Sequence, residues 1–246
     1  MLLVLGATPA AAGERYVALG DSYSSGTGTR TYFDAPCQRS VYAYPSLVDV
    51  QRPDTDLVFA ACSGARTGDV LNSQVSSLTT DTRWVTITIG GNDAGFSNVV
   101  SQCAPPSWLS NCNAAIDAAQ GYIRTTLPGQ LDQVYGAIRS RSPGARVIVL
   151  SYPRLFMGVD CNAATFFSAV EMSRLNETAD LLRDTIRARV TAAGPSFLFR
   201  DAVGPFGGHA VCSASAWLNG LSNPLGESYH PNRTGHSSGM RRSCAA

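Results

Sequence analysis

Four residues far apart in the sequence could together carry out chemistry on a carbonyl group. Ser22 follows the apolar run 16–19 in a Gly-Asp-Ser sequence, Gly64 and Asn92 follow two later apolar runs, and His230 lies near the end of the chain. A serine hydroxyl attacks a carbonyl near neutral pH only with a base within hydrogen-bond reach, and a neutral imidazole suits that role. Taken alone, a serine after a strand is more often a cap or turn residue, so its candidacy depends on the other three residues.

The three histidines differ in their sequence context. His230 precedes Pro231-Asn232, which is typical of a helix start and would hold the imidazole at a helix N-terminus. His209 follows two glycines and is typical of a surface loop, whereas His236 is expected to cap or pack in the final helix. His230 is therefore the candidate base.

Five short apolar runs predict buried strands. They cover residues 16–19, 56–61, 84–89, 146–151 and 197–199. Helices are expected at 42–50, 67–78, 111–141 and 172–190, the third of them broken or kinked at Pro128-Gly129. Strands alternating with helices indicate a parallel sheet covered on both faces. Ligands of such sheets bind beyond the carboxyl ends of the strands, where Ser22, Gly64 and Asn92 are expected.

These motifs, taken in order, resemble the four sequence blocks of the SGNH hydrolases, also called GDSL lipases and esterases. The blocks are Gly-Asp-Ser at 20–22, a glycine at 64, Gly-Gly-Asn-Asp at 90–93 and a histidine at 230. The resemblance extends over nearly the whole chain, and four blocks in order are far more specific than a single Gly-Asp-Ser. It implies a flavodoxin-like, three-layer α/β/α sandwich whose five-stranded parallel sheet has the order 2-1-3-4-5.

The resemblance also implies a role for each of these residues. Ser22 would be the nucleophile and His230 the base, and the oxyanion hole would consist of the Ser22 and Gly64 backbone N–H groups and the Asn92 side-chain amide. Three fixed donors aimed at a developing alkoxide make physical sense, because loss of one typically lowers kcat by ~10²–10³-fold. Taken separately, Gly64 and Asn92 are equally well explained as ordinary turn residues.

The group that would orient His230 departs from the commonest pattern of the family. Many members place an aspartate three residues before the histidine, where this chain has Glu227. Glu227 could orient the imidazole through its longer side chain. Some secreted members with a Ser-Xaa-His segment use a backbone carbonyl instead, which here would be that of Ser228. The Ser228 carbonyl is the favoured interpretation, and Glu227 is the alternative.

The seven cysteines include no Cys-Xaa-Xaa-Cys pair of the kind that zinc sites favour. The three histidines lack a His-Glu-Xaa-Xaa-His pattern, so we expect no metal and no cofactor. In an exported protein such cysteines suggest disulfides. The resemblance to secreted members implies the pairs Cys37–Cys62, Cys103–Cys112 and Cys161–Cys212, with Cys244 left over.

Residues 1–12 are typical of the remnant of a secretion signal, with a short apolar core followed by small residues. We expect residues 13–246 to form one hydrolase domain that is secreted to the extracellular space, with its last residues a candidate for disorder. No apolar stretch of the sequence approaches the ~20 residues of a transmembrane helix. The formal net charge of +1 gives no sign of a nucleic-acid partner, and we expect a monomer.

Residues and resemblance together predict a secreted serine ester hydrolase that forms an acyl-enzyme intermediate. Lipid esters are the favoured substrates, as for a lipase, esterase or phospholipase A, with transient contact to a lipid surface. The preference for lipids rests on the resemblance to secreted bacterial lipases and phospholipases. Local support consists of aromatic residues that could line an acyl groove, namely Tyr23, Tyr32, Phe33, Phe96, Trp108, Phe156 and Trp217.

Two alternatives to a lipid ester hydrolase remain open from the sequence. A carbohydrate acetyl esterase would use the same residues, and acyl-chain preference would separate the two activities. A non-catalytic secreted binding module could keep the fold without the activity, although the complete set of four blocks argues against such decay. Retained ester hydrolysis would reject the binding module.

Overall fold

The computed structural model describes residues 13–245, so the proposed signal remnant at 1–12 lies outside the described residues. Five strands form one parallel sheet in the order β2-β1-β3-β4-β5, which confirms the order expected from the resemblance. Their bounds are β1 Glu14–Gly20, β2 Thr55–Phe59, β3 Thr82–Thr88, β4 Arg146–Leu150 and β5 Phe197–Arg200. Four consecutive residues of β1, from Tyr16 to Leu19, are at most 1% exposed, as a central strand covered on both faces requires.

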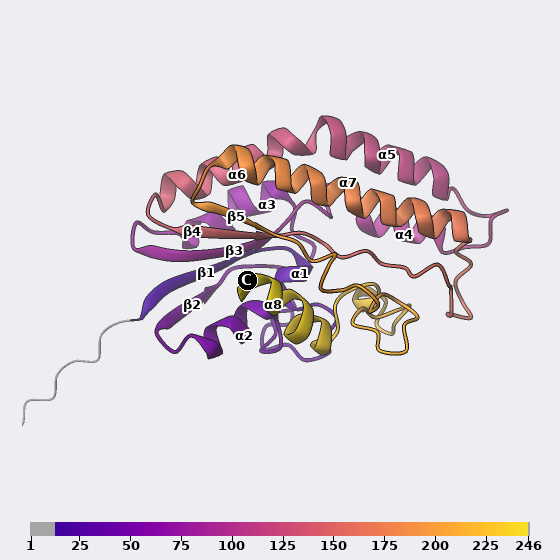
Figure 1. The fold of residues 1–246 in the computed structure, drawn as a ribbon, viewed down its shortest axis with the longest axis horizontal. Coiled ribbons are helices and arrows are strands. Elements are labelled where there is room, and N and C mark those ends of the chain that lie inside the picture. Colours follow the sequence, from indigo (N-terminus) through magenta and orange to yellow (C-terminus); the bar gives the residue numbers. More distant parts are fainter. Residues whose placement is uncertain (1–12, 246) are drawn as a thin grey trace, which may run out of the picture.

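Helices cover both faces of the sheet and complete the predicted three-layer α/β/α sandwich (Figure 1). One face carries α3, α5, α6 and α7, and the other carries α2 and α8 (Figure 1). The helices are α1 Ser22–Ser25, α2 Tyr44–Gln51, α3 Thr67–Asn72, α4 Phe96–Cys103, α5 Cys112–Thr125, α6 Leu127–Arg141, α7 Ala169–Ala193 and α8 Arg241–Ala245. None of the helices in the described part of the chain combines the length and apolar character needed to cross a membrane.

The helix boundaries differ from the sequence prediction in several places. The expected break near Pro128 separates α5 from α6 at Thr126, with the proline in the first turn of α6, where its missing N–H costs no hydrogen bond. The single helix expected at 67–78 is α3 followed by the 3₁₀ turn Gln74–Ser77. The tail, which shows no pattern of helical continuation, is helical: the π-helical segment Gly235–Met240 runs directly into α8.

Three disulfides link segments that lie between or at the ends of the helices and strands. They join Cys37 to Cys62, Cys103 to Cys112 and Cys161 to Cys212, the same pairs that the resemblance implies. Cys244 in α8 is free and buried. The last two disulfides flank the segments that lead into α5 and α7, and the first lies beside the end of β2.

Candidate active site

Ser22 lies where β1 ends at the carboxyl edge of the sheet and α1 begins. Gly20, the last residue of β1, has a φ of 121°, and a Cβ there would collide with the carbonyl oxygen of Thr88. Asp21 caps α1, and its Oδ1 accepts a hydrogen bond of 2.9 Å from the Tyr23 N–H. This sharp turn from strand to helix presents Ser22 at the sheet edge.

The structure brings Ser22 and His230 together across 208 positions of sequence. The Ser22 Oγ lies 2.8 Å from His230 Nε2, and His230 Nδ1 lies 2.9 Å from the Ser228 carbonyl oxygen. A carbonyl can only accept, so Nδ1 carries the hydrogen and Nε2 is free to accept the Ser22 O–H. Burial lowers the pKa of His230 to about 4, although the Ser228 carbonyl acts in the opposite direction. The imidazole is therefore neutral near pH 7.

The Glu227 carboxylate binds groups other than His230. Its Oε1 accepts a hydrogen bond of 2.6 Å from the Tyr32 hydroxyl, and its Oε2 lies 3.5 Å from Arg30 Nε. No hydrogen bond between Glu227 and His230 occurs in the described residues. No contact therefore supports the alternative in which the Glu227 carboxylate orients His230. The Ser228 carbonyl faces His230 Nδ1 instead.

The segment that carries His230 is held by backbone contacts on both sides. The Tyr23 hydroxyl donates to the Tyr229 carbonyl at 2.7 Å, and the Asn219 N–H donates to the His230 carbonyl at 2.9 Å. Tyr229 adopts a φ of 59°, a conformation uncommon for an aromatic residue. This turn directs the Ser228 carbonyl back toward the imidazole two residues later.

Each of the three expected oxyanion donors keeps a hydrogen that no other protein group accepts in the described residues. Among residues 13–245, neither the Ser22 nor the Gly64 backbone N–H donates a hydrogen bond, so both are free for a ligand. Gly64 has a φ of 81°, and a Cβ at this position would meet no atom within 4 Å. The Asn92 side-chain amide donates one hydrogen to the Ala65 carbonyl at 3.0 Å, which fixes its orientation and leaves its second hydrogen.

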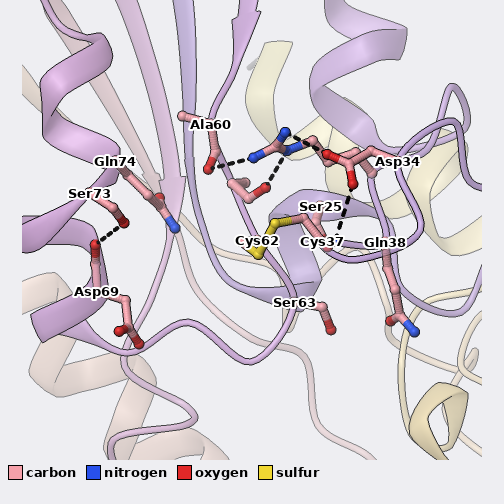
Figure 2. The surroundings of a disulfide bond; sticks show 12 residues. Ser25, Asp34, Cys37, Gln38, Ala60, Cys62, Ser63, Asp69, Ser73 and Gln74 are labelled. Carbon is pink, nitrogen blue, oxygen red and sulfur yellow. Dashed lines mark hydrogen bonds and ion pairs between the residues drawn. A yellow bond between two sulfur atoms is a disulfide. The ribbon is translucent and has the colours of Figure 1, made fainter.

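The turn that contains Gly64 is fixed to the loop after α1. The Cys37–Cys62 disulfide joins the two segments (Figure 2). Next to it, the Ser63 N–H donates to the Cys37 carbonyl at 3.0 Å, and the Thr27 hydroxyl donates to the Ser63 hydroxyl at 2.9 Å. The position of the Gly64 N–H therefore depends on the Cys37–Cys62 disulfide, a covalent clamp that ends two residues before Gly64.

A buried tyrosine that the sequence analysis did not select links two parts of the site. The Tyr152 hydroxyl donates to Asp21 Oδ2 and accepts a hydrogen bond of 3.0 Å from the Gly91 N–H. Burial raises the pKa of Asp21 to about 7, with the Tyr152 hydrogen bond acting in the opposite direction. Tyr152 lies two residues after the end of β4, and this place beyond the carboxyl end of a strand is the sequence signal that could have identified it.

An apolar cavity opens from Ser22 into the space between the sheet edge and helices α4, α5 and α7. Its apolar lining includes Tyr23, Phe96, Val99, Val100, Ala119, Ile123, Tyr152, Leu155, Leu175, Ala179 and Leu182. Of the seven aromatic residues expected to line an acyl groove, only Tyr23 and Phe96 do so. Phe156 instead packs on Phe167 in the core, and Phe33 and Trp108 are exposed.

The remaining histidines lie outside this site. His209 is in a loop, as expected, and stacks on Trp217 with a centroid separation of 3.7 Å. His236 is fully buried in the segment before α8, where its Nδ1 accepts a hydrogen bond of 3.3 Å from the Tyr44 N–H. Within the described part of the chain, no group of three or more histidine, cysteine, aspartate or glutamate side chains is arranged to hold a metal ion.

Comparison with known proteins supports the assignment that the geometry suggests. Residues 18–237 match the GDSL-like lipase/acylhydrolase family. A lipase of Streptomyces rimosus is 44% identical, in an alignment that covers 97% of this chain and 90% of the relative. The crystal structure of an extracellular lipase from Streptomyces rimosus has a TM-score of 0.88 at 42% identity, covering 95% of this chain and 99% of that one. That of phospholipase A1 from Streptomyces albidoflavus has a TM-score of 0.88 at 39% identity, with the same coverage. This chain therefore belongs to the GDSL-like lipase/acylhydrolase family and is an ester hydrolase.

Proposed function

We propose that this protein is a secreted hydrolase of lipid carboxylic esters that acts through an acyl-enzyme intermediate. The observation that carries the proposal is the chain of hydrogen bonds from Ser22 through His230 to the Ser228 carbonyl, at 2.8 and 2.9 Å, beside an apolar cavity. A positioned base of this kind typically contributes about 10²–10⁴-fold to the rate.

In the proposed reaction, Ser22 Oγ attacks the ester carbonyl while His230 Nε2 takes its proton. The Ser22 and Gly64 N–H groups and the Asn92 amide hydrogen bind the oxygen that becomes negatively charged. His230 then returns the proton to the leaving alcohol, which leaves an acyl group on Ser22. Water, deprotonated by His230, attacks this ester and releases the acid and the free serine.

The apolar cavity favours an acyl chain over a small acetyl group as the substrate's acid part. Its walls are formed mainly by aliphatic and aromatic side chains of α4, α5 and α7. The names of the most similar proteins, a lipase and a phospholipase A1, agree with lipid substrates. The three disulfides and the extracellular lipase relative support secretion.

Hydrolysis of p-nitrophenyl esters from acetyl to palmitoyl tests this proposal. Wild-type protein is expected to turn over these esters with an optimum at a medium or long chain. Ser22→Ala is expected to lose at least about 10⁴-fold in kcat. Ser173→Ala is the matched control, because it removes an exposed hydroxyl of α7 outside the site and is expected to retain activity.

Three results would overturn parts of the proposal. A sharp acetyl optimum would favour a carbohydrate acetyl esterase, and equal activity in Ser22→Ala would reject the serine mechanism. Folded wild-type protein with intact disulfides but without turnover on any ester would reject hydrolysis and favour a binding module.

A further inference from the structure

Large apolar side chains gather on two segments at the catalytic end of the molecule. Eleven such side chains are exposed among residues 13–245, and six of them lie in residues 104–111 and 157–170. We call these six the apolar rim: Trp108, Leu109, Met157, Val159, Phe166 and Val170, which are between 51% and 80% exposed. Figure 1 shows both segments at the end of the molecule toward which the carboxyl ends of the strands point. Clustered exposed apolar groups of this kind mark interaction sites.

The rim is held in place rather than being free to fold back. The Cys103–Cys112 disulfide closes the first segment, and Cys161–Cys212 fixes the second. The two segments meet where the Phe166 N–H donates to the Ala104 carbonyl at 2.9 Å. The backbone of both segments is therefore tied at defined points, and the rim side chains lie exposed on it.

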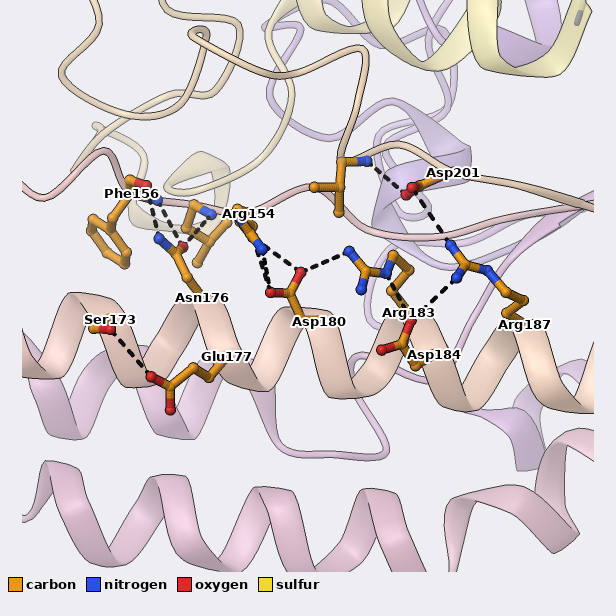
Figure 3. A network of polar contacts seen from close by, with 12 residues as sticks. Arg154, Phe156, Ser173, Asn176, Glu177, Asp180, Arg183, Asp184, Arg187 and Asp201 are labelled. Atoms are coloured by element: carbon orange, nitrogen blue, oxygen red, sulfur yellow. Dashed lines mark hydrogen bonds and ion pairs between the residues drawn. The ribbon is translucent and has the colours of Figure 1, made fainter.

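The start of the second segment is anchored on α7. Asn176 Oδ1 accepts hydrogen bonds from the Leu155 and Phe156 N–H groups at 3.1 and 3.2 Å, and its Nδ2 donates to the Phe156 carbonyl (Figure 3). Arg154 pairs with Asp180 one turn further along α7 (Figure 3). Met157, the first rim residue of this segment, therefore follows a fixed stretch of backbone.

The rim carries almost no charge. Residues 104–111 contain no ionisable side chain, and residues 157–170 contain only Asp160. The Asp160 carboxylate is occupied within its own loop, where it accepts hydrogen bonds from the Asn162 N–H, the Thr165 hydroxyl and the Phe167 N–H at 2.8–3.1 Å. The absence of arginine in both segments argues against an anionic partner, which would require basic residues.

The two rim segments adjoin the apolar cavity along the chain. Val99 and Val100 line the cavity and lie in the last two turns of α4, which leads directly into the first segment. Leu155 lines the cavity two residues before Met157. Both rim segments therefore begin within a few residues of side chains that line the cavity.

We infer that the apolar rim docks on the surface of a neutral or zwitterionic lipid aggregate and places the cavity against it. This inference rests on the proposed lipid ester hydrolysis. Trp108 and Leu109 enter the interfacial region, where a tryptophan ring is favoured because it is apolar with one polar edge. The interaction is hydrophobic, so it depends little on salt or on anionic lipid.

Sedimentation with phosphatidylcholine vesicles tests the inference. All proteins carry Ser22→Ala, so that the vesicles stay intact. Trp108→Ser/Leu109→Ser is expected to lower the partition coefficient at least about tenfold, because two apolar side chains no longer enter the lipid. The matched control is Val50→Ser, which removes a 78% exposed side chain of α2 at the opposite end of the molecule and is expected to bind unchanged. Adding phosphatidylglycerol or 1 M salt is expected to change binding less than about twofold.

Kinetics of the same substitutions with Ser22 intact separate docking from chemistry. The double variant is expected to hydrolyse monomeric p-nitrophenyl butyrate like wild type and to lose activity on vesicles. Equal vesicle binding by wild type and the double variant, equal loss in Val50→Ser, or binding only to anionic vesicles would each overturn the inference. Failure of the proposed function is distinct: it appears as no ester hydrolysis by wild type, whatever the vesicles show.

Discussion

Among single residues, the group that accepts the His230 Nδ1 hydrogen influences whether the proposed base is neutral or protonated. The Ser228 carbonyl is neutral, whereas a carboxylate in its place would favour the protonated imidazole through its charge. Burial lowers the pKa of His230 to about 4, and the carbonyl offsets this only in part. The imidazole thus stays unprotonated at neutral pH, and its orientation comes from a backbone turn instead of an ion pair.

Replacing Glu227 by glutamine is expected to leave kcat within about threefold of wild type. The glutamine oxygen can still accept the Tyr32 hydroxyl, and the Ser228 carbonyl still faces His230. A carboxylate that oriented the imidazole would cost about 10⁴-fold when changed to an amide. Steady-state kinetics on a soluble ester distinguish the two outcomes. A second variant, Glu227→Ala, is expected to lower the free energy of unfolding by about 1–3 kcal/mol, because the Tyr32 hydroxyl loses its partner.

Replacing Tyr152 by phenylalanine is expected to lower kcat about ten- to hundredfold with little change in KM. The ring still lines the cavity, but the link between Asp21 and the Gly91 N–H is lost, and Asn92 is the next residue. Small displacements of positioned donors have effects of this size. The control is Tyr135→Phe, whose buried hydroxyl has no hydrogen-bond partner in the described residues, and which should leave kcat unchanged. A Tyr152→Phe enzyme with wild-type kcat would contradict this positioning role.

The sequence allowed some site residues to be predicted and left others undetermined. Ser22 and His230 are predictable because each stands in a short motif beside an element boundary. The choice between Glu227 and the Ser228 carbonyl depends on the positive φ of Tyr229, which no propensity favours. Tyr152 stands directly after a predicted strand, but only the packed structure shows that its hydroxyl meets Asp21.

Among the elements, strands were easier to predict than the short helices around the site. Each strand contains a short apolar run, so its position follows from composition even though its ends shift by up to two residues, and this holds even for the edge strand β2, whose residues all stay partly exposed. Helix α4, for which the sequence gives no prediction, has eight residues and begins at Phe96 after Gly95, which provides no side-chain cap. Its place is determined by packing of Val99, Val100 and Cys103 in the core, a tertiary effect.

Removing the disulfides one at a time is expected to separate stability from activity. In the chain-entropy relation, Cys161→Ala/Cys212→Ala lowers the free energy of unfolding by about 4 kcal/mol and Cys37→Ala/Cys62→Ala by about 3.5 kcal/mol, since the bridged residues are 51 and 25 positions apart. Only the second pair adjoins the Gly64 turn, so it alone is expected to lower kcat on a soluble ester, by about tenfold. Urea unfolding and kinetics measure the two effects, and equal kcat in both variants would contradict the proposed clamp.

For the molecule as a whole, burial favours the neutral forms of Asp21, His230 and His236, with opposite consequences for the pH dependence of stability. The pKa of Asp21 is raised to about 7, so its contribution to stability is present at low pH and is lost as the pH rises toward 7. Burial lowers the pKa of His230 to about 4 and that of His236 to about 3, so their contributions are present above about pH 6.5 and are lost on acidification. On acidification, the stability contributed by Asp21 therefore increases while that contributed by His230 and His236 decreases. Single substitutions of these residues can separate the two effects.

Replacing His236 by asparagine is expected to make the protein less sensitive to acid. The asparagine oxygen can accept the Tyr44 N–H in place of Nδ1, but the side chain cannot be protonated. Unfolding exposes a histidine that binds a proton below about pH 6.5, whereas the buried one resists protonation down to about pH 3. Between pH 6 and pH 4, wild type should therefore lose free energy of unfolding relative to the variant at up to about 1.4 kcal/mol per pH unit. Urea unfolding at half-unit pH steps measures this slope. The matched control is His209→Asn, which replaces the histidine stacked on Trp217 in a loop. Parallel plots of unfolding free energy against pH for wild type and His236→Asn would show that His236 does not govern the loss of stability in acid.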